Sequence, residues 1–586
     1  MIIDGTISSE KTEFLIGKYA ELLNAAVDAS QILVLVQNSN LKNKFIERVL
    51  EKLEIDCFEK LQVHSFFSLV YNTICDNWAF IENGNPYDKP AVLPNLAGLE
   101  ISQFILNDIL RDVPFKGYNS KKSLLHQLFR RYSLIVQNNL TDDDVEWRSR
   151  VLGESFADDA KTALKKLLAK TLYLRDFDYL RQGLVFNYIY KNTKYFDNIK
   201  YLILDDGDEI TPICYDFIKY LVPQLKDAFV AFDSKGGSRI GYLSADRTAV
   251  WEFEKLLEQP VTVIDTKTNL KFDAETIFNN VTKCEFNTLN NFTIQSPSKR
   301  SKMIELASIK INELLKKQVN PSEISIITPV IDEMLKFGLK ENINRQANLM
   351  FLSGSEKLIQ NPLVLSAVTI LKLNTALKEK LTEFDLRPVL TNFLGIPLKY
   401  CREVLQDFDK NKVLPEYEFC CEEHNNKYQK LKEIVSKFAD GNVKLSEQVF
   451  EIYNELAELF SVDAVQLNKF NFFIKQLQDF ENIFGGDVLR RKEEILTRIE
   501  NSIISENPYS VLEIGDNDLV VGTPQKIIDN QIRTKYQFWL DISSDEWIKS
   551  DTGPLYNAWV FQRGWSKDEY TIDDNVELSR EKTARI

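Results

Sequence analysis

Apolar runs that alternate with amphipathic stretches are the feature that most limits how this chain of 586 residues can fold. The run ILVLV at residues 32–36 is typical of a buried strand, and residues 41–53 carry apolar side chains at helical spacing. Strand-like runs return at residues 199–206 and 228–233. Because strands that alternate with helices pair as parallel sheets with helices on their faces, the sequence predicts an α/β fold.

Two long stretches interrupt this alternation, and their apolar residues keep helical spacing without strand-like runs. Each interruption predicts a mainly helical insertion. The flanking stretches then combine into two α/β domains, as expected for a chain too long for one hydrophobic core. The predicted parts are a first domain at 1–90 and 196–287, an insertion at 91–195, a second domain at 288–373 and 508–586, and an insertion at 374–507.

The second domain is predicted to begin with the apolar segment FTIQ at residues 292–295. Its later strands, DLVVGT at 518–523 and YQFWLDI at 536–542, have no strand-like neighbours in the sequence. We therefore expect both to return to the sheet of the second domain. The charged sequence TDDDVEWRSR at 141–150 is expected to break the first helical insertion.

Composition excludes several classes of protein. The net charge of -14 and the pI of about 5.1 give no overall positive field, so a nucleic-acid site would have to be a local groove. The three histidines and seven cysteines lack the spacing of a metal site, and free thiols are expected. No apolar run reaches the roughly 18 residues of a membrane helix, and the N-terminus does not resemble a signal peptide. The sequence thus predicts a cytoplasmic protein without membrane contact.

The sequence GTISSEKT at residues 5–12 lies between a short apolar segment and a helical stretch. A phosphate-binding loop needs glycine where the backbone wraps phosphate, a lysine for the phosphates, and a hydroxyl for magnesium. Gly5, Lys11 and Thr12 fit these needs, whereas Glu10 stands where the loop should have its second glycine. The alternative is an ordinary helix N-terminus.

A strand-like run that ends in carboxylates, YLILDDGDEITP, occupies residues 201–212. In nucleotide-driven motors the first acid after such a strand holds magnesium and the second positions the attacking water. Asp205 and Asp206 are the candidates for these roles. For Asp208 and Glu209 we expect instead a solvated acidic loop.

The order and spacing of these segments resemble those of the UvrD/Rep family of superfamily 1 DNA helicases. VHSFFSLV at 63–70 is similar to the family's T-F-H-S segment, and residues 201–212 resemble its V-D-E-x-Q-D motif. Residues 231–245 resemble its third motif, and residues 519–542 its T-x-H-x-x-K-G-L-E-F motif. The resemblance implies two RecA-like P-loop domains, each a parallel sheet with a mainly helical insertion, around an ATP cleft.

The resemblance also implies ligands and roles for particular residues. ATP and Mg²⁺ would be held by Gly5, Lys11 and Thr12, with Thr12 and Asp205 on the metal and Asp205 and Asp206 as the catalytic pair. Single-stranded or junction DNA would be the partner in repair or recombination, together with other proteins of such a pathway. Tyr242 is the first candidate to stack on a base. Phe66 is the second, although core packing is the preferred interpretation for Phe66.

Several positions depart from the family pattern. The catalytic glutamate is the shorter Asp206, and the arginine of the fourth motif falls on Pro329. The arginine of the third motif falls on Leu243, and the histidine of T-x-H is Gln525. An arginine like that of the fourth motif accelerates phosphoryl transfer about a thousandfold or more. Because it is replaced here, we expect weak or absent hydrolysis of ATP. The alternative function is an inactive helicase-fold scaffold or DNA-binding subunit of a recombination complex.

The last arginine motif of the family should fall near the C-terminal sequence ELSREKTARI. Arg580 and Arg585 are its candidates in this chain.

Overall fold

The computed structural model describes most of the chain, and its residues form two compact units. The described residues are 1–6, 9–53, 61–77, 96–97, 99–118, 120–168, 173–174, 186–246, 249–264, 270–289, 291–352, 358–440, 443–456, 464–485, 487–502, 514–547 and 552–586. The first unit comprises residues 1–94, 105–353 and 511–586, and the second comprises residues 95–104 and 354–510. Both large sheets belong to the first unit.

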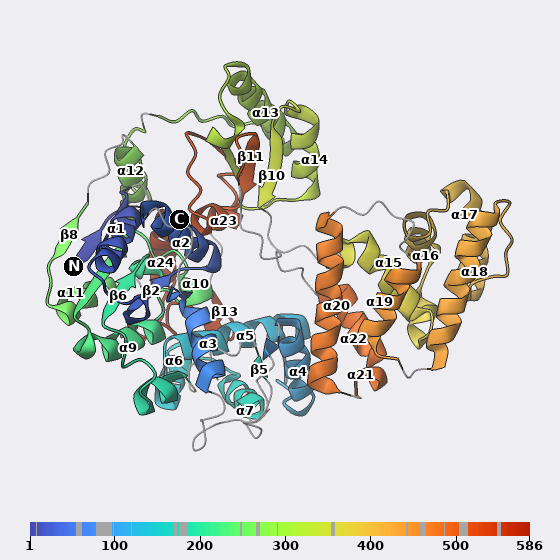
Figure 1. Ribbon diagram of the computed structural model, residues 1–586, viewed down its shortest axis with the longest axis horizontal. Helices are drawn as coiled ribbons and strands as arrows, with labels where there is room; N and C mark the ends of the chain where they lie inside the picture. The colour runs from blue at the N-terminus through green and yellow to red at the C-terminus, as the bar shows by residue number, and fades with distance from the viewer. Residues whose placement is uncertain are drawn as a thin grey trace. The chain divides into compact units, whose positions relative to one another are not determined.

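A six-stranded parallel sheet runs through the first unit in the order β3-β2-β6-β7-β1-β8. Figure 1 labels β2, β6 and β8 of this sheet. Its strands are β1 (Ile2–Asp4), β2 (Ile32–Val36), β3 (Val63–Ser65), β6 (Tyr201–Leu204), β7 (Asp227–Phe232) and β8 (Val261–Val263). Every residue of β2 is buried, as expected for a strand covered by helices on both faces. The α/β prediction is confirmed for this part of the chain.

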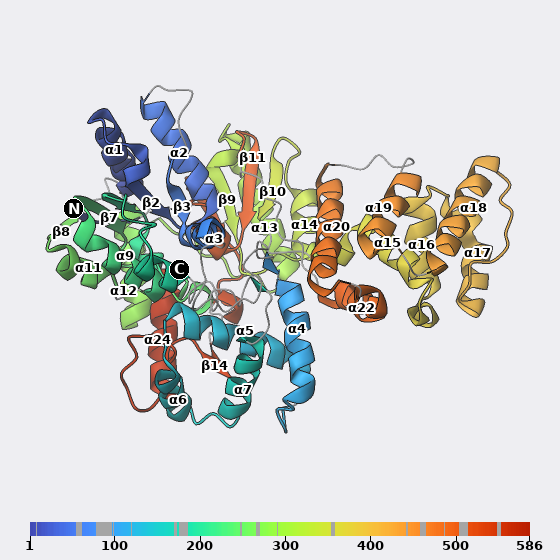
Figure 2. The same cartoon turned by 60° about the horizontal axis from the view of Figure 1, so that its bottom comes forward.

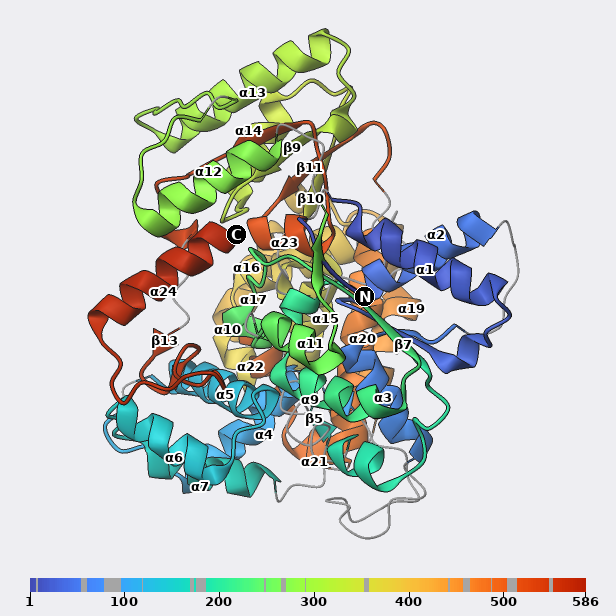
Figure 3. The same cartoon turned by 90° about the vertical axis from the view of Figure 1, so that its left-hand side faces the viewer.

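Amphipathic helices cover this sheet and form its core. Helices α1 (Lys11–Asn24) and α2 (Ser39–Leu53) lie close together (Figure 3) and bury their apolar faces against β2 and its neighbours. Tyr19 and Phe45 meet edge to face with their ring centroids 6.0 Å apart. The remaining helices of this region are α3 (Phe66–Asn77), α9 (Pro212–Leu221), α10 (Ile240–Leu243), α11 (Ala249–Leu257) and α12 (Leu270–Lys283).

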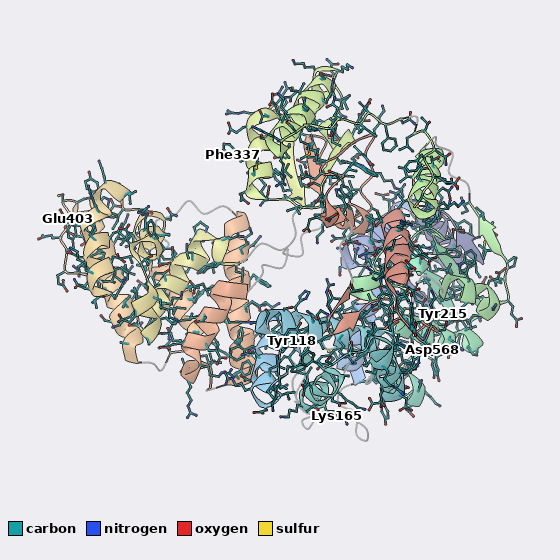
Figure 4. All side chains as sticks on the ribbon, turned by 180° about the vertical axis from the view of Figure 1, so that it is seen from behind. Tyr118, Lys165, Tyr215, Phe337, Glu403 and Asp568 are labelled. Carbon is teal, nitrogen blue, oxygen red and sulfur yellow. The ribbon has the colours of Figure 1, made fainter. Side chains whose placement is uncertain are left out.

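A second parallel sheet has four strands in the order β10-β11-β9-β12. They are β9 (Ile324–Ile327), β10 (Asn348–Leu352), β11 (Asp518–Gly522) and β12 (Tyr536–Trp539). Because β11 and β12 pair with β9, the predicted return of these two late strands is confirmed. Helices α13 (Arg300–Lys316) and α14 (Glu333–Asn342) pack on this sheet, and Phe337 of α14 stays 68% exposed (Figure 4).

The apolar segment FTIQ at residues 292–295, near the predicted start of the second domain, forms no strand. Ile294 is 83% exposed, so the apolar pattern of this segment finds no surface to bury against. Only its first residue is anchored, because the ring of Phe292 packs edge-on against Trp539 with centroids 6.2 Å apart. Along the chain, the first strand of this sheet is therefore β9, since an apolar run forms a strand only where the fold supplies a partner.

The first helical insertion contains α4 (Leu99–Asp112), α5 (Lys121–Gln137), α6 (Asp142–Val151) and α7 (Ala157–Leu168). The charged sequence at 141–150 does not break this insertion, because it forms α6. Thr141 and Asp144 make a reciprocal capping box at its start, and Arg148 and Arg150 occupy its last turn. Acids at the first turn and bases at the last turn suit the helix dipole, which explains the error.

After β12 the chain returns to the helical insertion and the first sheet. The guanidinium of Arg131, buried and paired with Glu154 at 2.5 Å, also donates to the carbonyl of Leu555 at 3.1 Å. Helix α24 (Ile572–Arg585) then packs on α12 (Figures 2 and 3). Within the predicted stretch 508–586, the strands thus serve the second sheet, whereas the later residues contact elements of the predicted first domain and first insertion.

The second unit is built from helices. They are α15 (Pro362–Lys372), α16 (Glu383–Pro388), α17 (Leu398–Asn411), α18 (Glu422–Lys437), α19 (Leu445–Leu456), α20 (Ala464–Phe484), α21 (Asp487–Arg490) and α22 (Lys492–Ser502). Among the described residues of the whole chain, no helix combines the length and apolar character needed to cross a membrane.

Candidate functional site

The carboxyl ends of β1, β6 and β7 meet at one edge of the six-stranded sheet, because the three strands are parallel and β7 lies between the other two. Lys11 and Thr12 begin helix α1 after the loop that follows β1, and Asp205 and Asp206 lie directly after β6. The fold therefore brings these residues together although the sequence separates the two pairs by about 190 positions, as the 193-residue spacing of Thr12 and Asp205 shows.

The loop after β1 folds tightly over itself. The amide of Gly5 donates to the carbonyl of Phe232 at 2.9 Å, and the hydroxyl of Ser9 donates to the carbonyl of Thr6 at 2.7 Å. A Cβ atom on Gly5 would lie 2.1 Å from the Ser9 hydroxyl oxygen, so a larger residue here would force Ser9 to move. Glu10 ends the loop with φ 61° and ψ 20°, a left-handed conformation that favours glycine, and its side chain is exposed.

Lys11 begins helix α1 and is buried among carboxylates. Its Nζ atom lies 3.0 Å from Oδ1 of Asp206 and 3.9 Å from Oδ1 of Asp208. Burial alone would lower the pKa of Lys11, but the negative charges of Asp206, Asp208 and the neighbouring acids raise it above the ordinary value. Lys11 is therefore charged and already paired.

Thr12 and Asp205, the two residues expected to hold a metal ion, are in direct contact. The hydroxyl of Thr12 donates to Oδ2 of Asp205 at 2.8 Å, and the amide of Asp206 donates to Oδ1 of Asp205 at 3.1 Å. Burial, followed by the charge of Asp206, raises the pKa of Asp205. A buried carboxylate that shares a hydroxyl in this way could hold a divalent cation together with that hydroxyl, since both supply oxygen ligands.

Asp208 and Glu209 are not a solvated acidic loop, so that expectation was wrong. The carboxylate of Asp208, which is 5% exposed, accepts from the amides of Asp233 at 2.8 Å and Gly237 at 2.9 Å. The carboxylate of Glu209 accepts from the amide of Ser238 at 3.0 Å. These carboxylates accept hydrogen bonds from backbone amides of the loop that follows β7. Local sequence could not reveal this role, because the partners lie about 25 to 30 positions away.

A polar segment from the second sheet contacts the same edge. We call residues 524–531, which include α23 (Pro524–Asp529), the bridging segment. Asp529 pairs with Arg239 at 2.6 Å, and its carbonyl accepts from the side-chain amide of Asn38 at 2.8 Å. Gln531 donates to Oδ2 of Asp206 at 3.2 Å. Sequence analysis missed Arg239, Asp529 and Gln531. For Asp529 and Gln531, the polar run DNQ at residues 529–531 was the available signal.

Helix α24 also reaches the loop after β7. The guanidinium of Arg585 donates to the carbonyls of Ser234, at 3.4 Å, and Gly236, and it pairs with Glu581 at 2.9 Å. Of the two arginines considered for the last motif, Arg585 therefore lies beside the site edge. Pro329, the position at which the sequence comparison expects an arginine, lies just after β9 and is separated from its end by Thr328.

The two residues predicted to stack on DNA bases have different outcomes. The ring of Phe66 packs edge to face on Phe186, with centroids 5.8 Å apart, and on Phe217 at 6.4 Å. This agrees with the preferred interpretation of Phe66 as a core residue. Tyr242 lies in α10, but its side chain is outside the described residues.

A cavity of about 240 Å³ opens beside Asp205 and Asp206, on the side of the edge formed by β2, β3 and β6. Its lining mixes apolar and polar residues: Leu35, Val36, Gln37, Asn38, Ser39, Ser65, Phe66, Phe67, Gln137, Leu204, Asp205, Asp206, Glu209, Ile210, Thr211, Cys214 and Arg239. Two partly separate features thus share this edge of the sheet. One is the group of Lys11, Asp206 and Asp208, which we call the Lys11 cluster, and the other is this cavity.

Comparison of the sequence with models of known protein families gives no match, and comparison with curated proteins gives none either.

Proposed function

We propose that this chain is a UvrD/Rep-like helicase-family protein that binds a magnesium nucleotide at Lys11, Thr12 and Asp205 and a DNA strand at the same sheet edge, with slow turnover. One observation carries the proposal. At the N-terminus of α1, the Thr12 hydroxyl meets the Asp205 carboxylate at 2.8 Å, and the neighbouring residue Lys11 is a buried cation. A hydroxyl, a carboxylate and a lysine at a helix N-terminus are the groups that a P-loop uses.

The residues present fit ATP and Mg²⁺ in their chemistry. Thr12 and Asp205 would hold the cation, and Lys11 with the first amides of α1 would face the phosphates. ATP, when bound, would supply a phosphoanhydride bond whose hydrolysis can drive motion. The exposed side chain of Glu10 stays outside the buried cluster, which weakens its repulsion of phosphate, although its strained backbone remains.

Two features support slow turnover. Asp206 is shorter than the glutamate of the family pattern, and its two carboxylate oxygens already contact Lys11 at 3.0 Å and Gln531 at 3.2 Å. A general base must reach the water that it activates, so an acid held by two other side chains acts poorly. The arginine that would stabilise the transition state is replaced by Pro329.

DNA as the partner rests on the resemblance and on the position of the cavity. With a net charge of -14, attraction to phosphates must come from local groups rather than from the whole protein. Single-stranded or junction DNA, a role in repair or recombination with partner proteins, and a cytoplasmic location accordingly remain part of the proposal.

The second candidate is a helicase-fold scaffold that binds no nucleotide. The pairing of Lys11 with Asp206 and Asp208 favours it, because the lysine is satisfied without phosphate. A titration of ATP with and without Mg²⁺, on the wild type and on Lys11→Ala, distinguishes the two. Magnesium-dependent binding that Lys11→Ala abolishes supports the nucleotide-binding protein, whereas no binding to the wild type supports the scaffold.

A further inference from the structure

The cavity beside Asp205 is closed on one side by the end of a helix from the first insertion. Gln137 is the last residue of α5 and lines the cavity together with Phe66, Phe67 and Arg239. The volume of about 240 Å³ far exceeds the roughly 15 Å³ that one water needs, and it is smaller than the roughly 300 Å³ at which drug-sized pockets begin. A single ring system matches this size.

Gln137 is the unusual residue among those that line this cavity, because its side-chain amide is buried without a hydrogen-bond partner among the described residues. Gln137 is 1% exposed, and neither its Nε2 nor its Oε1 atom has a hydrogen-bond partner among the described residues. Nearly all buried polar side-chain atoms in folded proteins are hydrogen-bonded, so an amide with both ends unsatisfied indicates a missing partner. The Nε atom of Arg239, another lining residue, also lacks a partner in the described part of the chain.

The chemistry of the walls restricts that partner. An amide with a free donor beside a free acceptor pairs with a planar group that offers an acceptor beside a donor. The carboxylates of Asp205, Asp206 and Glu209 also line the cavity and would repel phosphate. Since carboxylates only accept hydrogen bonds, they favour a ligand that carries an amino group over one that carries only carbonyl oxygens.

We propose that this cavity takes one unstacked base of a DNA strand and prefers adenine or cytosine over thymine, with Gln137 as the specificity-determining residue. Adenine and cytosine both carry an exocyclic amino group beside a ring nitrogen, which matches the amide and the carboxylates, and the half-buried rings of Phe66 and Phe67 supply the apolar walls. The inference rests on the proposed function, because it needs a strand bound at this edge. It adds a base preference that backbone contacts alone would not give.

Fluorescence anisotropy tests this with oligothymidylate of twelve nucleotides whose central position is thymine, adenine, cytosine or abasic. We expect adenine or cytosine at that position to tighten binding at least about fivefold over thymine, which corresponds to one good amide–base pair. Gln137→Leu should remove this difference, so that the four strands with adenine, cytosine, thymine or no base no longer rank by the presence of an amino group. Equal affinities of the wild type for the four strands would overturn the base preference alone. Absence of binding to every strand would overturn both the preference and the DNA part of the proposed function.

Gln127, on the same helix, is the matched control. Its amide is satisfied, since it donates to Ser123 at 3.0 Å and accepts from the amide of Leu555 at 3.0 Å. Gln127→Leu should lower the melting temperature and keep the base preference. Gln137→Leu should not lower the melting temperature, because an apolar side chain replaces an amide that has no partner. A base preference that survives in Gln137→Leu would show that Gln137 does not determine it.

Discussion

Lys11 and Asp206 face each other at 3.0 Å, and both side chains are almost completely buried. In a P-loop, the positive charge of the lysine faces the phosphates. In this chain the charge of Lys11 is already matched by the carboxylate of Asp206, which follows β6, and one strand, β7, separates β6 from β1 in the sheet. The nucleotide that we propose for this site would therefore have to compete with an internal ion pair. The same pair links the loop after β1 to the loop after β6, so it also contributes to the stability of the site.

Removal of the lysine should destabilise the fold. Lys11→Ala leaves Asp206 and Asp208 buried without their cation, and breaking one side of such a pair costs about 3–5 kcal/mol. Urea unfolding should show this loss. Lys18→Ala provides the control, because its pair with Glu21 at 2.7 Å is largely exposed and such pairs contribute about 0–1 kcal/mol. Equal losses in the two variants would mean that the Lys11 cluster is solvated in solution.

Glycine at position 10 should stabilise the protein. Glu10 has φ 61°, and a residue with a side chain pays about 1–2 kcal/mol in this conformation. After the entropy cost of glycine, Glu10→Gly should raise the free energy of unfolding by about 0.5–1 kcal/mol. Ala26→Gly, at φ 58°, should give a similar gain. Only Glu10→Gly should also tighten ATP binding; an equal effect of both variants on ATP would argue against a phosphate loop.

Stability should depend on pH through the buried acids. Burial and the charge of Asp206 raise the pKa of Asp205 to about 7. The folded state then holds this proton more tightly than the unfolded state, whose pKa is about 3.9, so the carboxyl costs stability as pH rises from about 4 to 7. Asp205→Asn should therefore stabilise the protein more at pH 8 than at pH 5 relative to the wild type. Chemical unfolding at both values measures this, and an opposite trend would contradict the raised pKa.

The bridging segment should depend on Arg239. The Arg239 side chain is 6% exposed and pairs with Asp529 at 2.6 Å. Arg239→Ala leaves the partly buried Asp529 unpaired and should speed proteolysis of residues 524–531. Arg300→Ala is the control, since Arg300 is 30% exposed in its pairs with Asp332 and Asp541. If both variants are cleaved in this segment at the wild-type rate, the Arg239 pair does not hold it.

Sequence alone predicted the features whose cause is local. The buried strands β2, β6 and β11 are continuous apolar runs, and Lys11, Thr12 and Asp205 follow from residue type and spacing after such runs. It failed where the partner is distant. The hydrogen bond from Gln531 to Asp206 joins residues 325 positions apart. The backbone amides that donate to the buried carboxylate of Asp208 come from the loop after β7, which has no regular structure.

Two segments whose structure differs from what their local sequence pattern suggests also show that tertiary partners matter. Residues 292–295 are an apolar run near the predicted start of the second domain, but no strand among the described residues pairs with them. Residues 141–150 look like a charged break, yet the order of their charges suits a helix that begins with a capping box at Thr141. Pattern decides which conformation is available, and the tertiary partner decides whether it forms.

The contact between Thr12 and Asp205 gives the most direct test of the nucleotide site. Calorimetric titration with ATP and Mg²⁺ should be carried out on the wild type, Thr12→Ala, Asp205→Asn and the double variant, with Thr141→Ala as a control remote from the site. If the two residues share one cation, each single variant should weaken binding at least tenfold, and the double variant should be no weaker than the worse single variant. Wild-type affinity in both single variants, or no binding of magnesium nucleotide to the wild type, would contradict the account.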